Sequence, residues 1–236
     1  LKAINPSGNG RIKNLIAVGN TLYFSADDGT NGEELWTSDG TTAGTVMVKD
    51  IRTGGTWAPL SGLSHASELT AFGDVYFIAT DGTHGEELWK SDGTETGTVM
   101  VKDINSGSDS SSPSQLIVVD NVLYFEADDG INGCQLWKSD GTETGTVMVN
   151  STSSHNCGSD YLNFGTLLYF SADQATNSNV SGWVSDGTPD GANIIDGFYG
   201  SESVVDTSWW LFGHGTSLYI QVNLASGQVL LVKISI

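Results

Sequence analysis

The sequence is short of proline, cysteine and basic residues, and the last shortage narrows the possible functions. It has 4 prolines, 2 cysteines and 9 lysines plus arginines among 236 residues, against 28 acidic residues, so the formal net charge is −19. Binding to nucleic acid depends on lysine and arginine displacing counterions from phosphates. A nucleic-acid partner is therefore not expected.

Long hydrophobic runs are also missing. No apolar segment approaches the roughly 20 residues that cross a bilayer, and the first ten residues lack the apolar core of a secretory signal. We therefore expect a soluble chain without membrane insertion, from which any signal has been removed.

What the sequence does have is glycine and a period-2 pattern. It contains 30 glycines, and only 16% of its residues are charged. No window supports an amphipathic helix, whereas alternating apolar and polar residues recur along the chain. This composition is typical of a turn-rich β protein.

Internal repeats define the organisation of the chain. The string Leu-Tyr-Phe-Ser-Ala-Asp-Asp-Gly at residues 22–29 recurs in altered form at residues 75–82, 123–130 and 168–173, with a degenerate copy at residues 218–220. A second string, Leu-Trp-x-Ser-Asp-Gly-Thr, follows at residues 35–41, 88–94 and 136–142, and more weakly at residues 183–188. Repeats of this length indicate a propeller or a similar array.

Each repeat contains four β-like runs separated by turn residues, in the first copy residues 14–18, 21–26, 33–38 and 45–51. The sequence therefore predicts one all-β domain over residues 1–236, a five-bladed β-propeller of four-stranded antiparallel blades. The expected blades are approximately residues 13–51, 67–104, 115–150, 160–196 and 208–236.

The two ends suggest how the ring closes. Leu231 follows Tyr219 by 12 residues, as Leu35 follows Tyr23, and the sequence then stops before a fourth strand. Residues 1–8 parallel residues 101–107, which form a fourth strand in the prediction. We expect strand 1–4 to complete blade five and close the ring, which removes exposed sheet edges. Two alternatives stay open: a remnant of a preceding repeat, or a strand donated to the next molecule of a polymer.

The Glu-Leu-Trp-x-Ser-Asp-Gly-Thr strings at residues 34–41 and 87–94 resemble the bacterial ELWxxDGT repeat. This resemblance covers about four fifths of the chain, and it weakens in the fourth and fifth copies. It implies a propeller-like fold and an extracellular or cell-surface location. It implies no particular reaction, and a fold by itself does not identify a function.

Oxygen-bearing side chains gather in the connections between the second and third strands of the repeats. Calcium takes six to eight oxygen ligands, so bound calcium is one hypothesis for these connections; ordinary hairpin turns are the alternative. The candidate ligands are Asp27, Asp28, Asn31, Asp81, Asp128 and Asp129.

Cys134 and Cys157 lie in connections expected on the same face of the propeller, and an even pair in an extracellular chain predicts a disulfide. The sequons at Asn150 and Asn179 fall near that face and predict glycosylation only if the source glycosylates.

Residues that break the repeat are the candidates for ligand binding. Trp57 and His65 lie in an extra-long connection of the first repeat, where an exposed indole could stack on a sugar ring. The first functional hypothesis is thus an extracellular, non-enzymatic binding or adhesion module for glycans or a cell-surface partner. The alternatives are a self-assembling subunit of an extracellular filament or surface layer, and a carboxylate-dependent glycoside hydrolase.

Overall fold

The computed structural model describes residues 2–53, 69–149, 159–173, 180–188, 192–194, 204–206, 211–214, 217–224 and 229–235. The regular secondary structure in these ranges consists of β-strands, and they hold no helix long and apolar enough to cross a membrane. The all-β class predicted from the sequence is confirmed.

The described strands form four-stranded sheets. The first sheet contains β1 (Lys13–Val18), β2 (Thr21–Asp27), β3 (Glu33–Ser38) and β4 (Val46–Met47), and the second contains β5 (Thr70–Phe72), β6 (Asp74–Ala79), β7 (Glu87–Ser91) and β8 (Val99–Lys102). The third contains β9 (Ser114–Val119), β10 (Val122–Asp128), β11 (Cys134–Ser139) and β12 (Val147–Met148), and the fourth contains β13 (Ser159–Phe164), β14 (Leu167–Asp173), β15 (Val180–Ser185) and β16 (Ala192–Ile194). The fifth contains β17 (Val204–Asp206), β18 (Leu211–His214), β19 (Ser217–Leu224) and β20 (Val229–Ser235).

All strand pairs are antiparallel, as predicted. In the first four sheets neighbouring strands follow the order of the sequence, whereas in the fifth sheet β17, β18 and β20 each pair with β19. Tight hairpins make these meanders possible: Asp120 and Asn121 join β9 to β10 with φ of 47° and 63°. Asp and Asn tolerate positive φ, which a two-residue turn of the primed type requires at both central positions.

The fourth strand of the first sheet is shorter than the predicted run 45–51. Val48 N still donates a 2.8 Å hydrogen bond to Leu35 O, but the next residues leave β3 and pack on the second sheet. Ile51 lies buried in the same core cluster as Trp89 of β7. The chain therefore uses this segment to join two sheets rather than to extend one.

The apolar core lies between successive sheets. One cluster joins Tyr23 and Leu35 of the first sheet to Phe77 and Trp89 of the second, and equivalent clusters lie at the next two boundaries. The repeated tryptophans Trp36, Trp89, Trp137 and Trp183 are 4–6% exposed. The last three pack against the preceding sheet, whereas Trp36 packs against Ile4 of the N-terminal segment.

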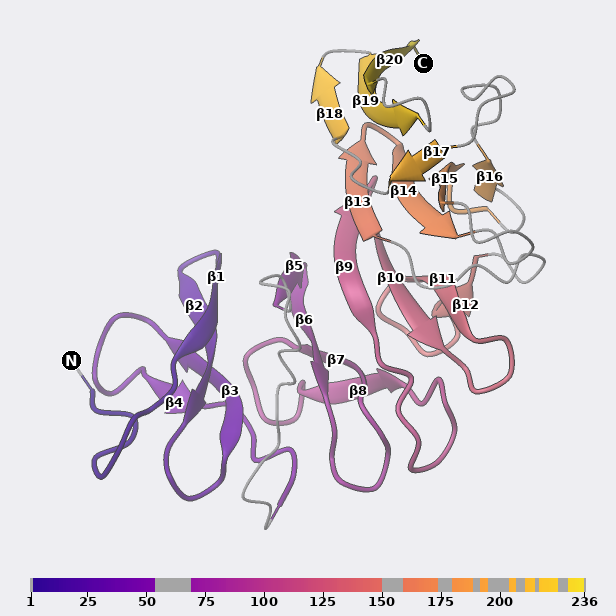
Figure 1. The fold of residues 1–236 in the computed structure, drawn as a ribbon. Helices are drawn as coiled ribbons and strands as arrows, with labels where there is room; N and C mark the ends of the chain where they lie inside the picture. Colours follow the sequence, from indigo (N-terminus) through magenta and orange to yellow (C-terminus); the bar gives the residue numbers. More distant parts are fainter. Residues whose placement is uncertain are drawn as a thin grey trace.

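The sheets follow one another along an open arc (Figure 1). Neighbouring sheets contact each other through one strand of each: β1 contacts β5, β5 contacts β9, β9 contacts β13, and β13 contacts β18. The N-terminus lies beside the first sheet and the C-terminus beside β20, at the other end of the arc. This arrangement of four-stranded sheets is propeller-like.

The predicted closure of the ring by strand 1–4 is not confirmed in the part of the chain that the structure describes. Residues 2–10 form no strand, and β20 pairs with β19 alone among the described residues. Ile4 instead packs in a buried cluster with Phe24, Ala26 and Trp36 of the first sheet. The N-terminal segment thus contacts the first sheet, as expected of a preceding fourth strand, but does not bring the fifth sheet with it.

Candidate functional site

The repeated Asp-Gly-Thr strings form self-contained turns. Asp39 Oδ1 accepts hydrogen bonds from Thr41 N at 2.8 Å and Thr41 Oγ1 at 2.7 Å. These bonds hold the pKa of the Asp39 carboxyl below its ordinary value. Asp92, Asp140 and Asp186 make the same pair of bonds with the threonine two residues later. The four carboxylates therefore stabilise turns.

Each of these turns, after the first, receives a tyrosine from the preceding sheet. A Cβ placed on Gly93 would lie 2.7 Å from the Tyr23 hydroxyl, and a Cβ on Gly141 or Gly187 would collide with the hydroxyl of Tyr76 or Tyr124. Burial, then the charges of Asp74 and Asp140, raise the pKa of Tyr76 to about 12. Glycine is required because the tyrosine occupies the space of a side chain.

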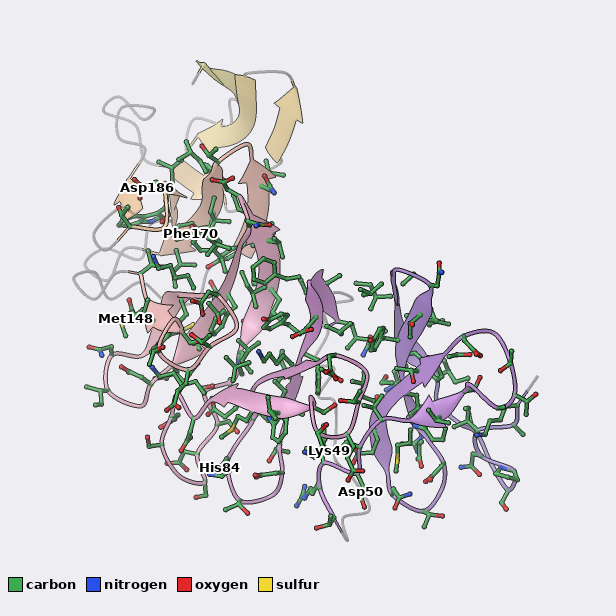
Figure 2. The ribbon with its side chains drawn as sticks, turned by 180° about the vertical axis from the view of Figure 1, so that it is seen from behind. Lys49, Asp50, His84, Met148, Phe170 and Asp186 are labelled. Atoms are coloured by element: carbon green, nitrogen blue, oxygen red, sulfur yellow. The ribbon has the colours of Figure 1, made fainter. Side chains whose placement is uncertain are left out.

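A lysine from the end of the first sheet and one from the end of the second sheet reach the same region of the next sheet. Lys49 Nζ donates to Thr98 O at 2.8 Å, and Lys102 Nζ donates to Thr146 O at 2.9 Å. Figure 2 shows Lys49 in the segment between the first and second sheets. The boundaries between these sheets therefore combine an apolar core with polar contacts that repeat along the chain.

The N-terminal segment makes these contacts on the first sheet. Lys2 Nζ donates to Thr45 O at 2.6 Å and lies 5.7 Å from the centre of the Trp36 ring. Lys102 lies 5.8 Å from the Trp137 ring. Residues 2–4 therefore occupy, on the first sheet, the place that the fourth strand of a preceding sheet occupies elsewhere.

No sheet among the described residues covers the rest of the first sheet's outer face. This face carries a groove of about 280 Å³ that is lined by Lys2, Ile4, Ile12, Leu15, Leu22, Phe24, Ser38, Gly40, Thr41 and Thr45. Ile12 is 53% exposed and Leu15 is 61% exposed. Both side chains line the groove and leave apolar surface in contact with water.

The equivalent face of the next two sheets is buried. In each sheet the repeated tyrosine pairs with a residue of the first strand, and the leucine just before that residue holds an equivalent position. These leucines are Leu15 in the first sheet, Leu69 in the second and Leu116 in the third. Leu69 is 8% exposed and Leu116 is 7% exposed, because the preceding sheet covers each of them. Leu15 therefore belongs to a sheet-packing surface that lacks its covering sheet.

The predicted calcium ligands are engaged in hydrogen bonds within their own connections. Asp28 Oδ1 accepts Thr30 N and Asn31 N, both at 2.8 Å, and Asp28 Oδ2 accepts Asn31 Nδ2 at 2.8 Å. Partial burial raises the pKa of Asp28, but these bonds outweigh it and leave that pKa lowered. Asp81 and Asp129 make the corresponding bonds, and Asp27 and Asp128 each accept a glycine amide.

Among the described residues, no group of three or more His, Cys, Asp and Glu side chains converges as it would around a metal ion. Calcium binding stays a prediction. Trp57, His65, Asn150, Cys157 and Asn179 lie outside the described residues, whereas Cys134 begins β11. The predicted ligand stack, disulfide and glycosylation therefore stay predictions.

Sequence reasoning missed the buried glutamates, three of which join strands or sheets. Glu34 and Glu87 are fully buried and accept backbone N–H bonds from Ile51 at 3.2 Å and Ile104 at 3.1 Å. Glu126 accepts the Tyr161 hydroxyl at 2.7 Å. The repeated glutamate before Leu-Trp was a signal for the first two. These carboxyls tie strands and sheets together.

No protein-family model matches the sequence, and no curated protein matches it. Oligopeptidase B from Leishmania major is 14% identical with a TM-score of 0.51, over 97% of this chain and 31% of that chain. A mutant of puromycin hydrolase complexed with PGG is 12% identical with a TM-score of 0.50, over 97% of this chain and 39% of that chain. This chain thus spans less than two fifths of either protein, and at these identities the likeness shows a propeller-like fold alone.

The likeness extends to glycosidases at lower structural similarity. An endo-arabinase from Bacteroides thetaiotaomicron VPI-5482 is 12% identical over 98% of this chain and 95% of that chain, with a TM-score of 0.34. This score is too low to support a conclusion about the fold or the reaction.

Proposed function

We propose that the chain is a self-associating structural module, in which the uncovered face of the first sheet packs against the fifth sheet of a second copy. The observation that carries this proposal is the exposure of Leu15, 61%, where the equivalent leucines of the second and third sheets are 8% and 7% exposed. Copies joined in this way form a head-to-tail chain, because the two surfaces differ.

The surface matches an interface type that this protein already uses. Apolar cores join the first four sheets to one another. A β-sheet of the same repeat that covered Leu15 and Ile12 would form one more core of this kind. Full burial of such a side chain contributes about 1.5 to 3 kcal/mol. The groove thus fits another sheet of this kind rather than a small polar ligand.

Charge favours the two ends as partners. Residues 1–26 contain Lys2, Arg11 and Lys13 and no acidic residue, whereas residues 189–236 contain the acidic residues Asp190, Asp196, Glu202 and Asp206 and a single basic residue, Lys233. The whole chain has a net charge of −19, so two copies repel each other. The opposite charges of the two ends reduce this repulsion only when the copies meet head to tail. A head-to-head pair would bring like charges together.

The resemblance to the ELWxxDGT repeat supports an assembly outside the cell or on its surface, as a filament or a layer. Closure of a five-bladed ring within one chain is the competing arrangement, since it covers the same face with the same sheet. In the open arc, the fifth sheet lies away from the first (Figure 1). This leaves the face accessible to a second copy.

Sedimentation velocity over a range of protein concentrations tests the proposal, with electron microscopy of the concentrated protein. We expect the mass to rise with concentration and Leu15→Asp to prevent the rise. The control is Ile131→Asp: Ile131 is 87% exposed but does not line the groove, so this variant should associate normally. A wild-type protein that stays monomeric at every concentration overturns the proposal, and a lower melting temperature of monomeric Leu15→Asp then supports intramolecular closure.

A further inference from the structure

A tyrosine and a lysine act together at two of the boundaries between sheets, whereas at the first boundary Tyr23 pairs with Thr37. Tyr124 pairs across β10 and β11 with Lys138, and both reach the fourth sheet's turn at Gly187. The tyrosine hydroxyl lies over the glycine, and Lys138 Nζ donates a hydrogen bond to Gly187 O. Tyr76 pairs in the same way with Lys90, and both side chains lie at Gly141.

The turn of the first sheet has the same construction and lacks these partners. Gly40 has a φ of +88°, close to +90° at Gly93 and +87° at Gly141, and Gly40 N donates to Ser38 Oγ at 3.1 Å as in the other turns. No atom of the described residues lies within 4 Å of the place that a Cβ would take on Gly40. As far as the described residues go, the slot that a tyrosine hydroxyl fills elsewhere is therefore empty in the first sheet, and it opens on the groove.

The fifth sheet carries the complementary pair at the matching register. Tyr219 on β19 pairs with Lys233 on β20, as Tyr124 on β10 pairs with Lys138 on β11. On its other side Tyr219 pairs with Phe212 of β18, as Tyr124 pairs with Ile117 of β9. The fifth sheet therefore places both residue types where the third sheet places them.

We propose that Tyr219 and Lys233 of one copy are the recognition pair for the Asp39-Gly40-Thr41 turn of the next copy. This inference rests on the proposed self-association and adds its specificity. The apolar groove alone accepts any hydrophobic sheet. The slot is open only because residue 40 is a glycine, and it lies beside a carboxylate and a backbone carbonyl. It therefore selects a tyrosine hydroxyl next to an ammonium group.

Filling the slot is the sharpest test. Gly40→Asn keeps a residue type that tolerates positive φ, and it places a side chain where the tyrosine would enter. The matched control is Gly19→Asn, because Gly19 has a φ of +59° and also has nothing within 4 Å of its Cβ position, but it lies in the β1–β2 turn and does not line the groove. We expect Gly40→Asn to weaken self-association at least about tenfold, and Gly19→Asn to leave it unchanged.

Tyr219→Phe tests the partner residue, with Tyr23→Phe as its control. Loss of the hydroxyl that fills the slot should weaken association by roughly tenfold for Tyr219→Phe. Tyr23 fills the Gly93 slot within its own chain, so Tyr23→Phe should lower the melting temperature and leave the dissociation constant unchanged.

The outcomes separate the two proposals. If the wild-type protein associates and Leu15→Asp prevents it, but Gly40→Asn and Tyr219→Phe associate normally, the recognition pair is wrong and the self-association stands. If the wild-type protein does not associate, the proposed function fails first. If both variants instead destabilise a monomer, the pair acts within one chain, and recognition between copies is overturned.

Discussion

The hydroxyl of Tyr161 on β13 donates a 2.7 Å hydrogen bond to Glu126 Oε1 on β10, across the boundary between the third and fourth sheets. Glu126 is 3% exposed, and Ser114 Oγ donates to its other oxygen at 3.3 Å. Burial, followed by the charge of Glu126 and this bond, raises the pKa of Tyr161 well above its ordinary value. A carboxylate thus lies inside an otherwise apolar boundary and depends on its hydroxyl donors.

Tyr161→Phe should destabilise the protein, because it leaves a buried carboxylate with one donor fewer. A hydrogen bond to a charged group contributes about 1.5 to 3 kcal/mol. Ser25 and Ser171 stand at the position of Glu126 in the first and fourth sheets, so Glu126→Ser is compatible with the strand. Urea unfolding of the double mutant should show less than the sum of the two single losses; additive losses would contradict a direct coupling.

The N-terminal segment should stabilise the first sheet. Deleting residues 1–5 removes the Lys2 bond to Thr45 O and the packing of Ile4, which is 8% exposed. Burial of one isoleucine contributes about 1.5 to 3 kcal/mol, so thermal unfolding should occur at a clearly lower temperature. Lys2→Ala keeps Ile4 and should have a small effect. An unchanged melting temperature in the deletion variant would show that the segment does not dock.

The strands and turns of the repeat could be predicted from the sequence, because the interactions that form them are local. Alternation predicted β2 and β3, and Asp-Gly predicted the turn at Gly40, whose backbone needs positive φ. The burial of Trp36 followed from its repetition. The likeness of residues 1–4 to residues 101–104 instead predicted that they complete the fifth sheet, and this pairing is not confirmed, since Ile4 packs on the first sheet.

Properties that depend on distant partners could not be predicted. Leu15 and Leu116 have the same sequence pattern. Leu116 is buried because a preceding sheet covers it, whereas Leu15 is exposed. Glu126 appears polar in a period-2 strand, and its partner Tyr161 lies 35 residues away. The open arc likewise depends on the angle between sheets, which no local sequence pattern encodes.

The glycan hypothesis stays a separate prediction. A glycan array with calcium present should give binding that Trp57→Ala weakens, since stacking of an indole on a sugar ring supplies much of such affinity. Binding should also fall when a chelator removes calcium, if the Asp28 and Asp129 connections hold the ion. Ile131→Asp serves as a surface control. An array without binding, from protein with a normal melting curve, would count against this hypothesis.

Glu34 makes the stability of the first sheet depend on pH. The side chain is fully buried, and burial raises its pKa from 4.5 to about 8, although the Ile51 amide donates to it and lowers the pKa in part. Between these two values the unfolded chain has released the proton and the folded chain still holds it. The free energy of unfolding should therefore fall as pH rises from 4.5 to about 8 and change little above this range through this group.

Glu34→Gln isolates this contribution. Gln135 occupies the equivalent position in the third sheet, paired with Ala127 as Glu34 is paired with Ala26, so glutamine fits the strand. Urea unfolding at several pH values should show a smaller decrease for Glu34→Gln than for the wild-type protein. Glu95→Gln removes an exposed carboxylate and should leave the slope unchanged. If Glu34→Gln keeps the full wild-type slope, other carboxyls must cause the pH dependence.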